Sequence, residues 1–324
     1  MNDIEKTQHF SKNWEKLLYN INFKPANAVD PFAGNCDLVD YSPETSWELY
    51  DIDPKKENVQ IRDSLLNPIN YTGKTVITNP PYLSKSKTND FSKIFDKYKV
   101  DDLYKASILS IIGCKNGILI IPLNFFTDKK TKSVREKFLS QYKVSYVNYF
   151  TKQVFENTTY NVCAFYFEEG ETSDVIFHDY FADKDVKINL CKKYGYRVGG
   201  DFFSSYDNVH QEFSRVLKGD TPDTNIFVNC LDSRTRPFYL EYKPGYVHFA
   251  KQTDRIFATL KCHRDLTPEQ QKEIVKRFNT LIEEARANYG NLLFTNYRDN
   301  GRKKIALEDV YKICSKIAKD LNIF

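Results

Sequence analysis

The sequence contains little that would stabilise a fold covalently or through a metal. Its seven cysteines are an odd number without a Cys-x-x-Cys pair, and its five histidines show no ligand spacing. Paired cysteines and closely spaced Cys and His ligands are the patterns of disulfide frameworks and structural zinc sites. We therefore expect neither, and no metal in the functional site.

Long apolar runs are also lacking. The longest strongly apolar stretch, Gly117 to Phe126, is too short to cross a bilayer, and the N-terminus has charge but no apolar signal core. The chain also lacks internal repeats and low-complexity tracts. We expect a cytoplasmic protein without a membrane partner.

Neither sign of charge dominates, because 47 Lys and Arg stand against 43 Asp and Glu, a net charge of +4. An anionic partner such as DNA would have to meet local basic patches, since no large overall field steers it. The chain does have 41% hydrophobic and 15% aromatic residues, which argues against disorder. The whole chain is expected to fold.

A length of 324 residues suits two domains. Strand-like runs alternate with helical ones, which predicts a parallel α/β sheet. The acidic stretch from Glu168 to Asp174 predicts a domain boundary, with one domain at 1–168 and another at 169–324. The strand-like runs are Ala26 to Asp30, Trp47 to Asp53, Val59 to Asp63, Lys74 to Asn79, Gly117 to Pro122, Val144 to Phe150, Asn161 to Phe167 and Val175 to Tyr180. Helices are predicted at Trp14 to Ile21, Asp102 to Gly113, Ser133 to Tyr142 and, starting after Thr267, Pro268 to about Asn288.

The most informative four residues are Asn79-Pro80-Pro81-Tyr82, which follow the apolar run 75–78. Two prolines fix φ and remove two backbone N–H groups, so the chain leaves the strand as a stiff turn with carbonyl acceptors. The Asn79 side-chain oxygen and the Pro80 carbonyl could accept both hydrogens of an exocyclic amine, while the Tyr82 ring offers a face for stacking. Taken alone, such a motif is more often a turn than an active site.

A second motif stands at the end of the first predicted strand. Asp30-Pro31-Phe32-Ala33-Gly34 resembles the first motif of S-adenosylmethionine-dependent DNA amino-methyltransferases. The resemblance extends in order through the ends of the next strands and covers about residues 26–167. It implies that S-adenosylmethionine is held by the first motif, by Asp51 and Ile52, by Asp63 and Ser64, and by Asn79. Cys36 replaces the second glycine of the usual turn and should crowd it, and the helix after it has room for little more than two turns before Pro43.

The motif order, with a long remainder after Asn79-Pro-Pro-Tyr82, resembles the gamma group of these enzymes. It implies a Rossmann-like methyltransferase domain with a mixed, mostly parallel sheet, followed by a C-terminal α+β target-recognition domain. The implied activity is site-specific methylation of the N6 amino group of an adenine flipped out of double-stranded DNA. Tyr82 and Phe155 would stack the base, with Tyr160 as the second choice for Phe155.

The expected DNA contacts are basic residues near the motif and in the C-terminal half. They are Lys85, Lys87, Arg197, Arg234, Arg236, Arg298, Arg302 and Lys303. The partners expected from the resemblance are double-stranded DNA and a separate cognate restriction endonuclease. Three other readings stay open: methylation of cytosine N4, methylation of a glutamine amide in a protein, and a catalytically inert DNA-binding protein of the same fold. The recognised DNA site and the oligomeric state do not follow from the sequence.

Overall fold

The structure is a computed structural model that describes residues 14–155, 160–233, 236–290, 292–296 and 301–324. The chain forms two compact units, the first built on Met1–Val198 and the second on Gly199–Asn296 and Gly301–Phe324. No helix within these described stretches is long and apolar enough to cross a membrane.

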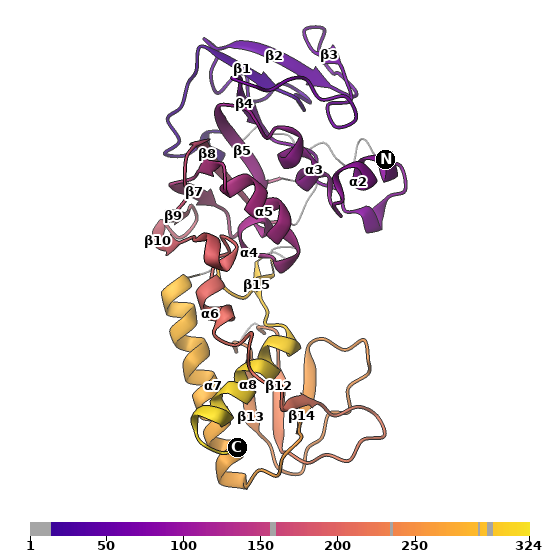
Figure 1. The fold of residues 1–324 in the computed structure, drawn as a ribbon, viewed down its shortest axis with the longest axis vertical. Helices are drawn as coiled ribbons and strands as arrows, with labels where there is room; N and C mark the ends of the chain where they lie inside the picture. Colours follow the sequence, from indigo (N-terminus) through magenta and orange to yellow (C-terminus); the bar gives the residue numbers. More distant parts are fainter. Residues whose placement is uncertain (1–13, 156–159, 234–235, 291, 297–300) are drawn as a thin grey trace. The chain divides into compact units, whose positions relative to one another are not determined.

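The first unit is organised around one mixed sheet in the order β10-β9-β7-β8-β5-β4-β1-β2-β3, with β6 paired to β8 (Figure 1). β1 to β5 pair in parallel, whereas β8 runs antiparallel to β5, β6 and β7. The strands are β1 (Asn27–Asp30), β2 (Ser46–Asp51), β3 (Gln60–Ile61), β4 (Thr75–Thr78), β5 (Asn116–Pro122), β6 (Tyr142–Lys143), β7 (Tyr146–Tyr149), β8 (Val162–Glu169), β9 (Asp174–Asp179) and β10 (Lys184–Asn189). The strands predicted from the sequence are confirmed to within a few residues at each end.

Short helices and 3₁₀ turns precede, connect and follow these strands. They are α1 (Trp14–Leu17), α2 (Ser92–Tyr98), α3 (Leu103–Ser110), α4 (Asn124–Thr127) and α5 (Lys132–Leu139), with 3₁₀ turns η2 (Lys85–Lys87), η3 (Lys129–Thr131) and η4 (Lys192–Tyr194). The short helix expected before Pro43 does not form, and residues 31–45 make turns instead. The N–H groups of Cys36, Val39 and Tyr41 each donate to the carbonyl three residues earlier, so no α-helical hydrogen bonding starts there.

The first unit continues thirty residues past the boundary that the acidic stretch suggested at residue 168. β9 pairs in parallel with β7, and β10 pairs antiparallel with β9. The acidic stretch is therefore a turn between two strands of one sheet, and the polypeptide leaves this unit only at Val198.

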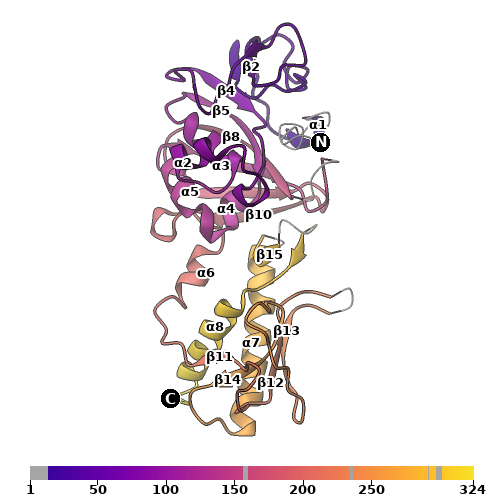
Figure 2. The ribbon, with the colours of Figure 1, turned by 90° about the vertical axis from the view of Figure 1, so that its right-hand side faces the viewer.

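The second unit is an antiparallel sheet packed against two helices, which agrees with the predicted α+β class (Figure 2). The sheet order is β11 (Phe213–Arg215), β14 (Phe257–Cys262), β12 (Ile226–Asn229) and β13 (Tyr239–Tyr242). α7 (Pro268–Tyr289) contacts β13, and α8 (Leu307–Asp320) contacts β11. Their shared core includes Val228, Leu240, Leu260, Phe278 and Ile313. A short helix α6 (Gly200–Ser204) and the hairpin strands β15 (Thr295–Asn296) and β16 (Arg302–Lys303) complete the unit.

The predicted start of the long helix is confirmed. The Thr267 hydroxyl accepts from the Gln270 N–H, and the Gln270 side chain accepts from the Thr267 N–H, with Pro268 at the first helical position. Such a capping box satisfies two N–H groups that a helix start leaves unpaired.

Candidate active site

The site lies where the strand order of the first sheet reverses. From β1 the chain adds β2 and β3 on one side, and then β4 and β5 on the other. The carboxyl ends of β1 and β4 therefore lie side by side, and the loops after them border the crevice in which open α/β sheets bind ligands. The two sequence motifs follow these two strand ends.

A hydrogen bond joins the two strand ends directly. The Thr78 hydroxyl donates to Asp30 Oδ1 over 2.6 Å, and the Phe32 N–H donates to the same oxygen over 3.0 Å. Asp30 is only 3% exposed. Burial raises its pKa to about 7, although the bonds from Thr78 and Phe32 act in the opposite direction. A carboxyl group with a pKa near neutrality at the edge of a sheet is a candidate functional group.

Asp51 supports the glycine turn that follows β1. Its Oδ2 accepts from the Gly34 N–H over 2.8 Å and its Oδ1 from the Asp53 N–H over 2.8 Å. Each carboxylate oxygen keeps a further lone pair, which a ribose hydroxyl could use. Ile52 beside it is 44% exposed, so this apolar side chain is accessible to a ligand ring.

The end of β3 brings Asp63 and Ser64 to the same edge. Asp63 Oδ1 accepts from the N–H groups of Leu65 and Leu66 over 3.0 and 2.8 Å. The Ser64 hydroxyl is buried and has no hydrogen-bond partner among the described residues, and the same holds for the Tyr71 hydroxyl. Buried hydroxyls without partners are costly. Together with the accessible Ile52, they fit a ligand that has polar groups and an aromatic ring, as S-adenosylmethionine does.

Cys36 adopts the backbone conformation that glycine usually takes in this turn. Its φ is +63°, and its N–H donates to the Ala33 carbonyl over 2.7 Å. A non-glycine residue in the left-handed region costs about 1 kcal/mol. The side chain is buried against Leu49 and Val59, and this burial raises the pKa of the thiol. The turn thus forms with Cys36 in place, and the raised pKa disfavours the nucleophilic thiolate form.

The Asn79 amide is oriented by the last residue of its own motif. The single proton of the Tyr82 hydroxyl is shared between Asn79 Oδ1 and, over 2.7 Å, the Ile120 carbonyl at β5. Burial raises the pKa of Tyr82 well above its ordinary value, so the hydroxyl keeps the proton that it donates. The Asn79 oxygen has a second lone pair for another donor. Pro80 is buried and Pro81 half-buried.

The segment after the motif is held by the start of α3. The Lys85 N–H donates to the Asp101 carbonyl over 2.8 Å, and the Leu103 N–H donates to the Leu83 carbonyl over 3.1 Å. Ser84 and Asp102 form an antiparallel bridge. These backbone bonds limit the positions that the motif can take.

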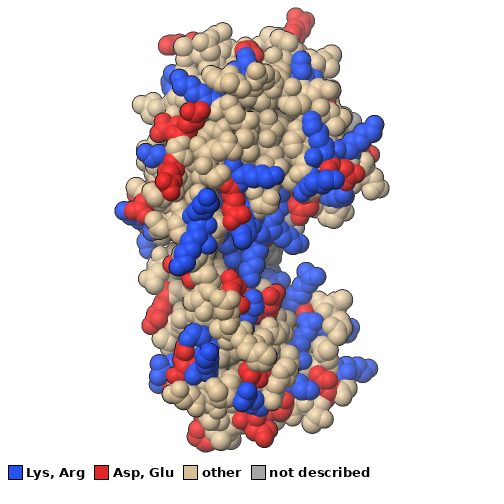
Figure 3. All heavy atoms as spheres, in the orientation of Figure 1, with Lys and Arg blue, Asp and Glu red and all other residues tan. Residues whose placement is uncertain are grey.

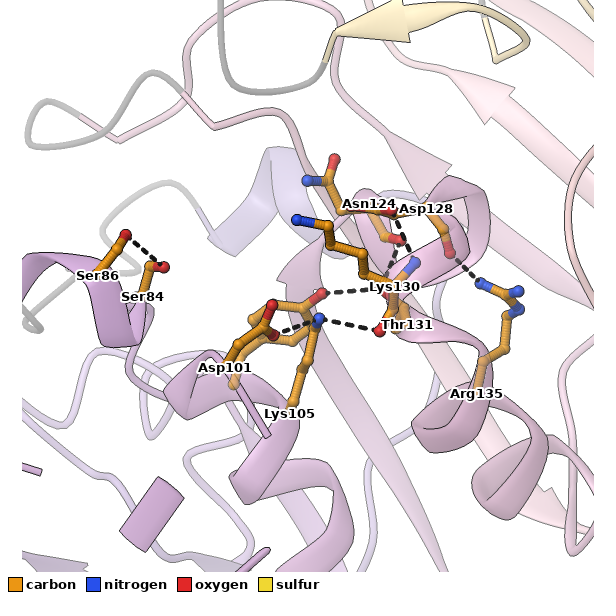
Figure 4. A network of polar contacts seen from close by, with 10 residues as sticks. Ser84, Ser86, Asp101, Lys105, Asn124, Asp128, Lys130, Thr131 and Arg135 are labelled. Carbon is orange, nitrogen blue, oxygen red and sulfur yellow. Dashed lines mark hydrogen bonds and ion pairs between the residues drawn. The ribbon is translucent and has the colours of Figure 1, made fainter. Parts of the chain in front are cut away.

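The start of α3 is in turn fixed to the turn after β5 (Figure 4). The buried Lys105 ammonium lies 2.7 Å from Asp101 Oδ1 and donates to the Lys130 carbonyl over 3.3 Å. Burial alone would raise the pKa of Asp101, but the Lys105 ammonium lowers it below its usual value. Arg135 Nη1 donates to the carbonyls of Phe125 and Asp128. Thr78, Lys105 and Arg135 have no signal in the sequence, because only the fold shows which main-chain and carboxyl groups they contact.

The two aromatic residues expected to stack a base are both buried. Tyr82 and Phe155 are each 4% exposed, and the Tyr82 ring packs edge-on against Tyr104 at 6.4 Å. Tyr160 is half-buried, and the Lys87 ammonium lies 5.7 Å above its ring. Of the three rings, Tyr160 is the most accessible.

The residues expected to contact DNA fall into three groups. Lys85 and Lys87 are exposed on η2, directly after the motif. Arg197 lies in the first unit rather than the C-terminal one, and its Nε donates to the Thr127 carbonyl over 2.8 Å. The second unit contains Arg236, Arg302 and Lys303, whereas Arg234 and Arg298 lie outside the described residues. Figure 3 shows basic and acidic side chains intermixed over the visible face, as expected from the small net charge.

The strand order defines an α/β protein with a Rossmann-like, mostly parallel sheet, and the two motifs stand at the carboxyl ends of its strands. Residues 42–155 match the model of the Eco57I restriction-modification methylase family. This segment contains Asn79-Pro-Pro-Tyr82, Asp51, Asp63 and Phe155. The predicted resemblance to restriction-modification methyltransferases is thereby confirmed, and so is the predicted fold class.

The solved structures that this chain matches include type I restriction-modification proteins. The EcoKI M protein is 14% identical, with a TM-score of 0.42, over 55% of this chain and 49% of that one. A modification subunit of a putative type I enzyme from Vibrio vulnificus YJ016 is 10% identical, with a TM-score of 0.44, over 80% of this chain and 59% of that one. The chain thus spans about half the length of these proteins. A search among curated proteins finds no match.

Proposed function

We propose that the protein is a DNA methyltransferase that transfers a methyl group from S-adenosylmethionine to the N6 amino group of adenine. The main support is that Asn79-Pro-Pro-Tyr82 follows β4 directly beside the end of β1, where Thr78 contacts Asp30 over 2.6 Å. The acceptor-rich turn after β4 and the glycine turn after β1, which is the expected cofactor site, therefore lie at the same edge of the sheet. The match of residues 42–155 to a restriction-modification methylase family supports the same substrate class.

In this proposal the motif holds the amino group and the other strand ends hold the methyl donor. When bound, S-adenosylmethionine would supply an activated methyl group on a sulfonium, which becomes a neutral thioether as the methyl leaves. The methylated amine nitrogen would then lose one proton to solvent. The Asn79 side-chain oxygen and the Pro80 carbonyl accept the two amine hydrogens. These two hydrogen bonds hold the nitrogen lone pair out of conjugation with the base ring. The Tyr82 hydroxyl keeps the Asn79 amide in the required orientation. Rate enhancement then comes from positioning and from charge stabilisation at nitrogen.

The proposal requires that the target base leaves the duplex stack. An aromatic neighbour recovers about 1–3 kcal/mol per stacked base. Tyr82 and Phe155 have to become more accessible before they can stack a base, whereas Tyr160 is partly exposed already. We therefore propose Tyr160, with Lys87 beside it, as an alternative to Phe155 for the second face of the base.

Cytosine N4 is the nearest alternative target, since the same acceptors serve either exocyclic amine. Cytosine N4 enzymes more often have Ser at the first motif position, so Asn79 favours adenine. An inert DNA-binding protein is the alternative from another class, and Cys36 in the glycine turn is its main support. Double-stranded DNA is the proposed partner in either case, with a separate cognate nuclease as a second partner of an active enzyme.

The decisive experiment measures methyl transfer and cofactor binding in parallel. The wild-type protein is incubated with labelled S-adenosylmethionine and duplex DNA, and modified positions are mapped in DNA from expressing cells. Asn79→Ala should abolish transfer while calorimetry shows S-adenosylmethionine affinity within about threefold of wild type, because Asn79 is only one of several residues expected to hold the cofactor, whereas its side-chain oxygen is essential for the acceptor amine. Comparable turnover in Asn79→Ala would contradict the assignment. Failure of the wild-type protein to bind S-adenosylmethionine would support the inert alternative.

A further inference from the structure

The sheet of the second unit has one side that faces away from its helices, and the segment 243–250 covers part of it, since the His248 N–H donates to the Thr259 hydroxyl over 2.8 Å. Val228, Leu240 and Ala258 lie opposite one another on neighbouring strands and belong to the core. Side chains alternate along a strand, so the next residues on each strand point to the other side. These include Phe227 on β12, Tyr239 on β13 and Phe257 on β14.

Aromatic rings gather on this outer side. The Phe227 ring centroid lies 6.4 Å from Tyr239, 6.2 Å from Phe257 and 5.5 Å from Tyr246. Phe257 is 44% exposed and Tyr246 38% exposed. We call the surface formed by Tyr239, Tyr246 and Phe257, together with the 8% exposed Phe227 ring that they pack against, the aromatic face. Exposed aromatic clusters of this kind mark interaction sites rather than ordinary surface.

Two cations lie directly over the rings of the aromatic face. The Arg236 guanidinium is 3.4 Å from the Tyr239 centroid, and the Lys243 ammonium is 4.1 Å from the Tyr246 centroid and 5.5 Å from that of Phe227. Such contacts hold a long flexible side chain in one place. Fixing it in advance lowers the entropy cost of a later contact with an anion.

The positive charges of Arg236 and Lys243 are only weakly neutralised by carboxylates among the described residues. Arg236 has an exposed partner, Glu241, at 3.7 Å, and such pairs contribute little in water. For Lys243, the described part of the chain places no carboxylate within 4.0 Å. An apolar protein partner would have to strip water from both cations, which is costly without compensating charge. A polyanion would instead supply negative charges that pair with both cations in their present positions.

We propose that the aromatic face docks the phosphate backbone of double-stranded DNA, with Arg236 and Lys243 as phosphate contacts. This inference rests on the proposed DNA methyltransferase function and assigns part of its substrate surface. A duplex fits better than a single strand, because cations already lie over Tyr239, Tyr246 and Phe227. Unpaired bases would have to displace these cations to stack on the rings, whereas phosphates approach the cations directly.

The test measures binding of the full chain to a labelled mixed-sequence duplex by fluorescence anisotropy at several salt concentrations. Arg236→Gln/Lys243→Gln should raise Kd about tenfold near 0.15 M salt. It should also reduce the slope of log K against log salt by roughly 1.8, since each lost phosphate contact removes about 0.9. Tyr239→Leu keeps both cations but removes the ring under Arg236. A smaller loss of about threefold is expected for this variant.

The matched control removes two cations from α7, on the helix side of the sheet. Lys272→Gln/Lys276→Gln changes the net charge equally and should leave Kd within about twofold of wild type. Equal effects of the two double variants would overturn the proposal, because net charge alone would then explain the loss. Tighter binding of a single strand of the same length, with the same dependence on Arg236 and Lys243, would overturn the assignment to a duplex.

Thermal unfolding of each variant checks that the fold is kept, since all four substituted cations lie at the surface. Measurements of S-adenosylmethionine binding and methyl transfer by the wild-type chain distinguish failure of the docking surface from failure of the proposed function. If the wild type methylates DNA and the Arg236/Lys243 variant binds duplex normally, this docking surface is wrong and the proposed function stands. If the wild type binds neither S-adenosylmethionine nor DNA, the proposed function itself fails.

Discussion

Asp30 is a buried carboxyl whose ionisation should oppose folding at neutral pH. Its pKa is raised from 3.8 to about 7 by burial. The stabilising contribution of the neutral form is complete below about pH 4 and is lost as pH rises through about 7. Asp30→Asn keeps an oxygen for the bonds from Thr78 and Phe32, both of which go to Oδ1, and removes the charge. We expect the free energy of unfolding at pH 8 to rise by a few kcal/mol.

Urea unfolding at a series of pH values measures this effect. The variant should show a weaker fall of stability between pH 4 and 7 than wild type. We also expect weaker S-adenosylmethionine binding, because a costly buried carboxylate at a site edge is best explained by function. An identical pH dependence in Asp30→Asn would show that Asp30 is not the group responsible.

At the residue scale, motif spacing predicted which residues stand at the carboxyl ends of the strands, but not how each side chain is held. Asp30 is the last residue of β1, and Asn79 directly follows the neighbouring strand β4, as predicted. The role of Thr78 depends on the pairing of β1 with β4, which connects residues far apart in sequence. Likewise, Cys36 was identified as a departure from the motif, whereas its φ of +63° follows from backbone packing that no local pattern encodes.

At the element scale, the start of α7 allows a quantitative test of a predicted feature. Thr267→Ala removes the hydroxyl that accepts from the Gln270 N–H over 3.3 Å. Loss of an N-cap of this type costs about 1 kcal/mol. We expect a reduction of that size in the free energy of unfolding of the second unit, measured by urea denaturation followed by circular dichroism. Thr267→Ser retains the cap and serves as the control, and equal stability of Ala and Ser variants would contradict the capping role.

Elements were predictable from the sequence where one face or one run of residues is strongly apolar. The parallel strands β4 and β5 are buried almost throughout, and such strands appear as continuous apolar runs. α8 was missed although Leu307, Val310, Cys314 and Ile317 recur at helical spacing, so the signal was present. β11 to β13 are only three or four residues long. Their existence depends on pairing with distant strands rather than on local preference.

At the scale of the whole molecule, β9 and β10 decide where the first unit ends. β9 covers the edge of β7, and the Phe177 ring packs against Phe126 at 5.3 Å. Further along, the Gly195 carbonyl accepts from Arg135 Nε over 2.7 Å. The chain between 169 and 198 therefore supplies core side chains and hydrogen bonds to the first unit, although the acidic composition at 168–174 suggested a linker.

Two fragments test this boundary. A fragment of residues 1–198 should be soluble, unfold cooperatively and bind S-adenosylmethionine, because it retains the complete sheet. A fragment of residues 1–168 should aggregate, since it exposes the β7 edge together with apolar side chains such as Phe126 and Val147, which are fully buried in the intact chain. Size-exclusion chromatography and thermal unfolding by circular dichroism distinguish the two outcomes. If the shorter fragment were as soluble and as stable as the longer one, β9 and β10 would not be needed for the fold, and the first unit would end where the acidic turn begins.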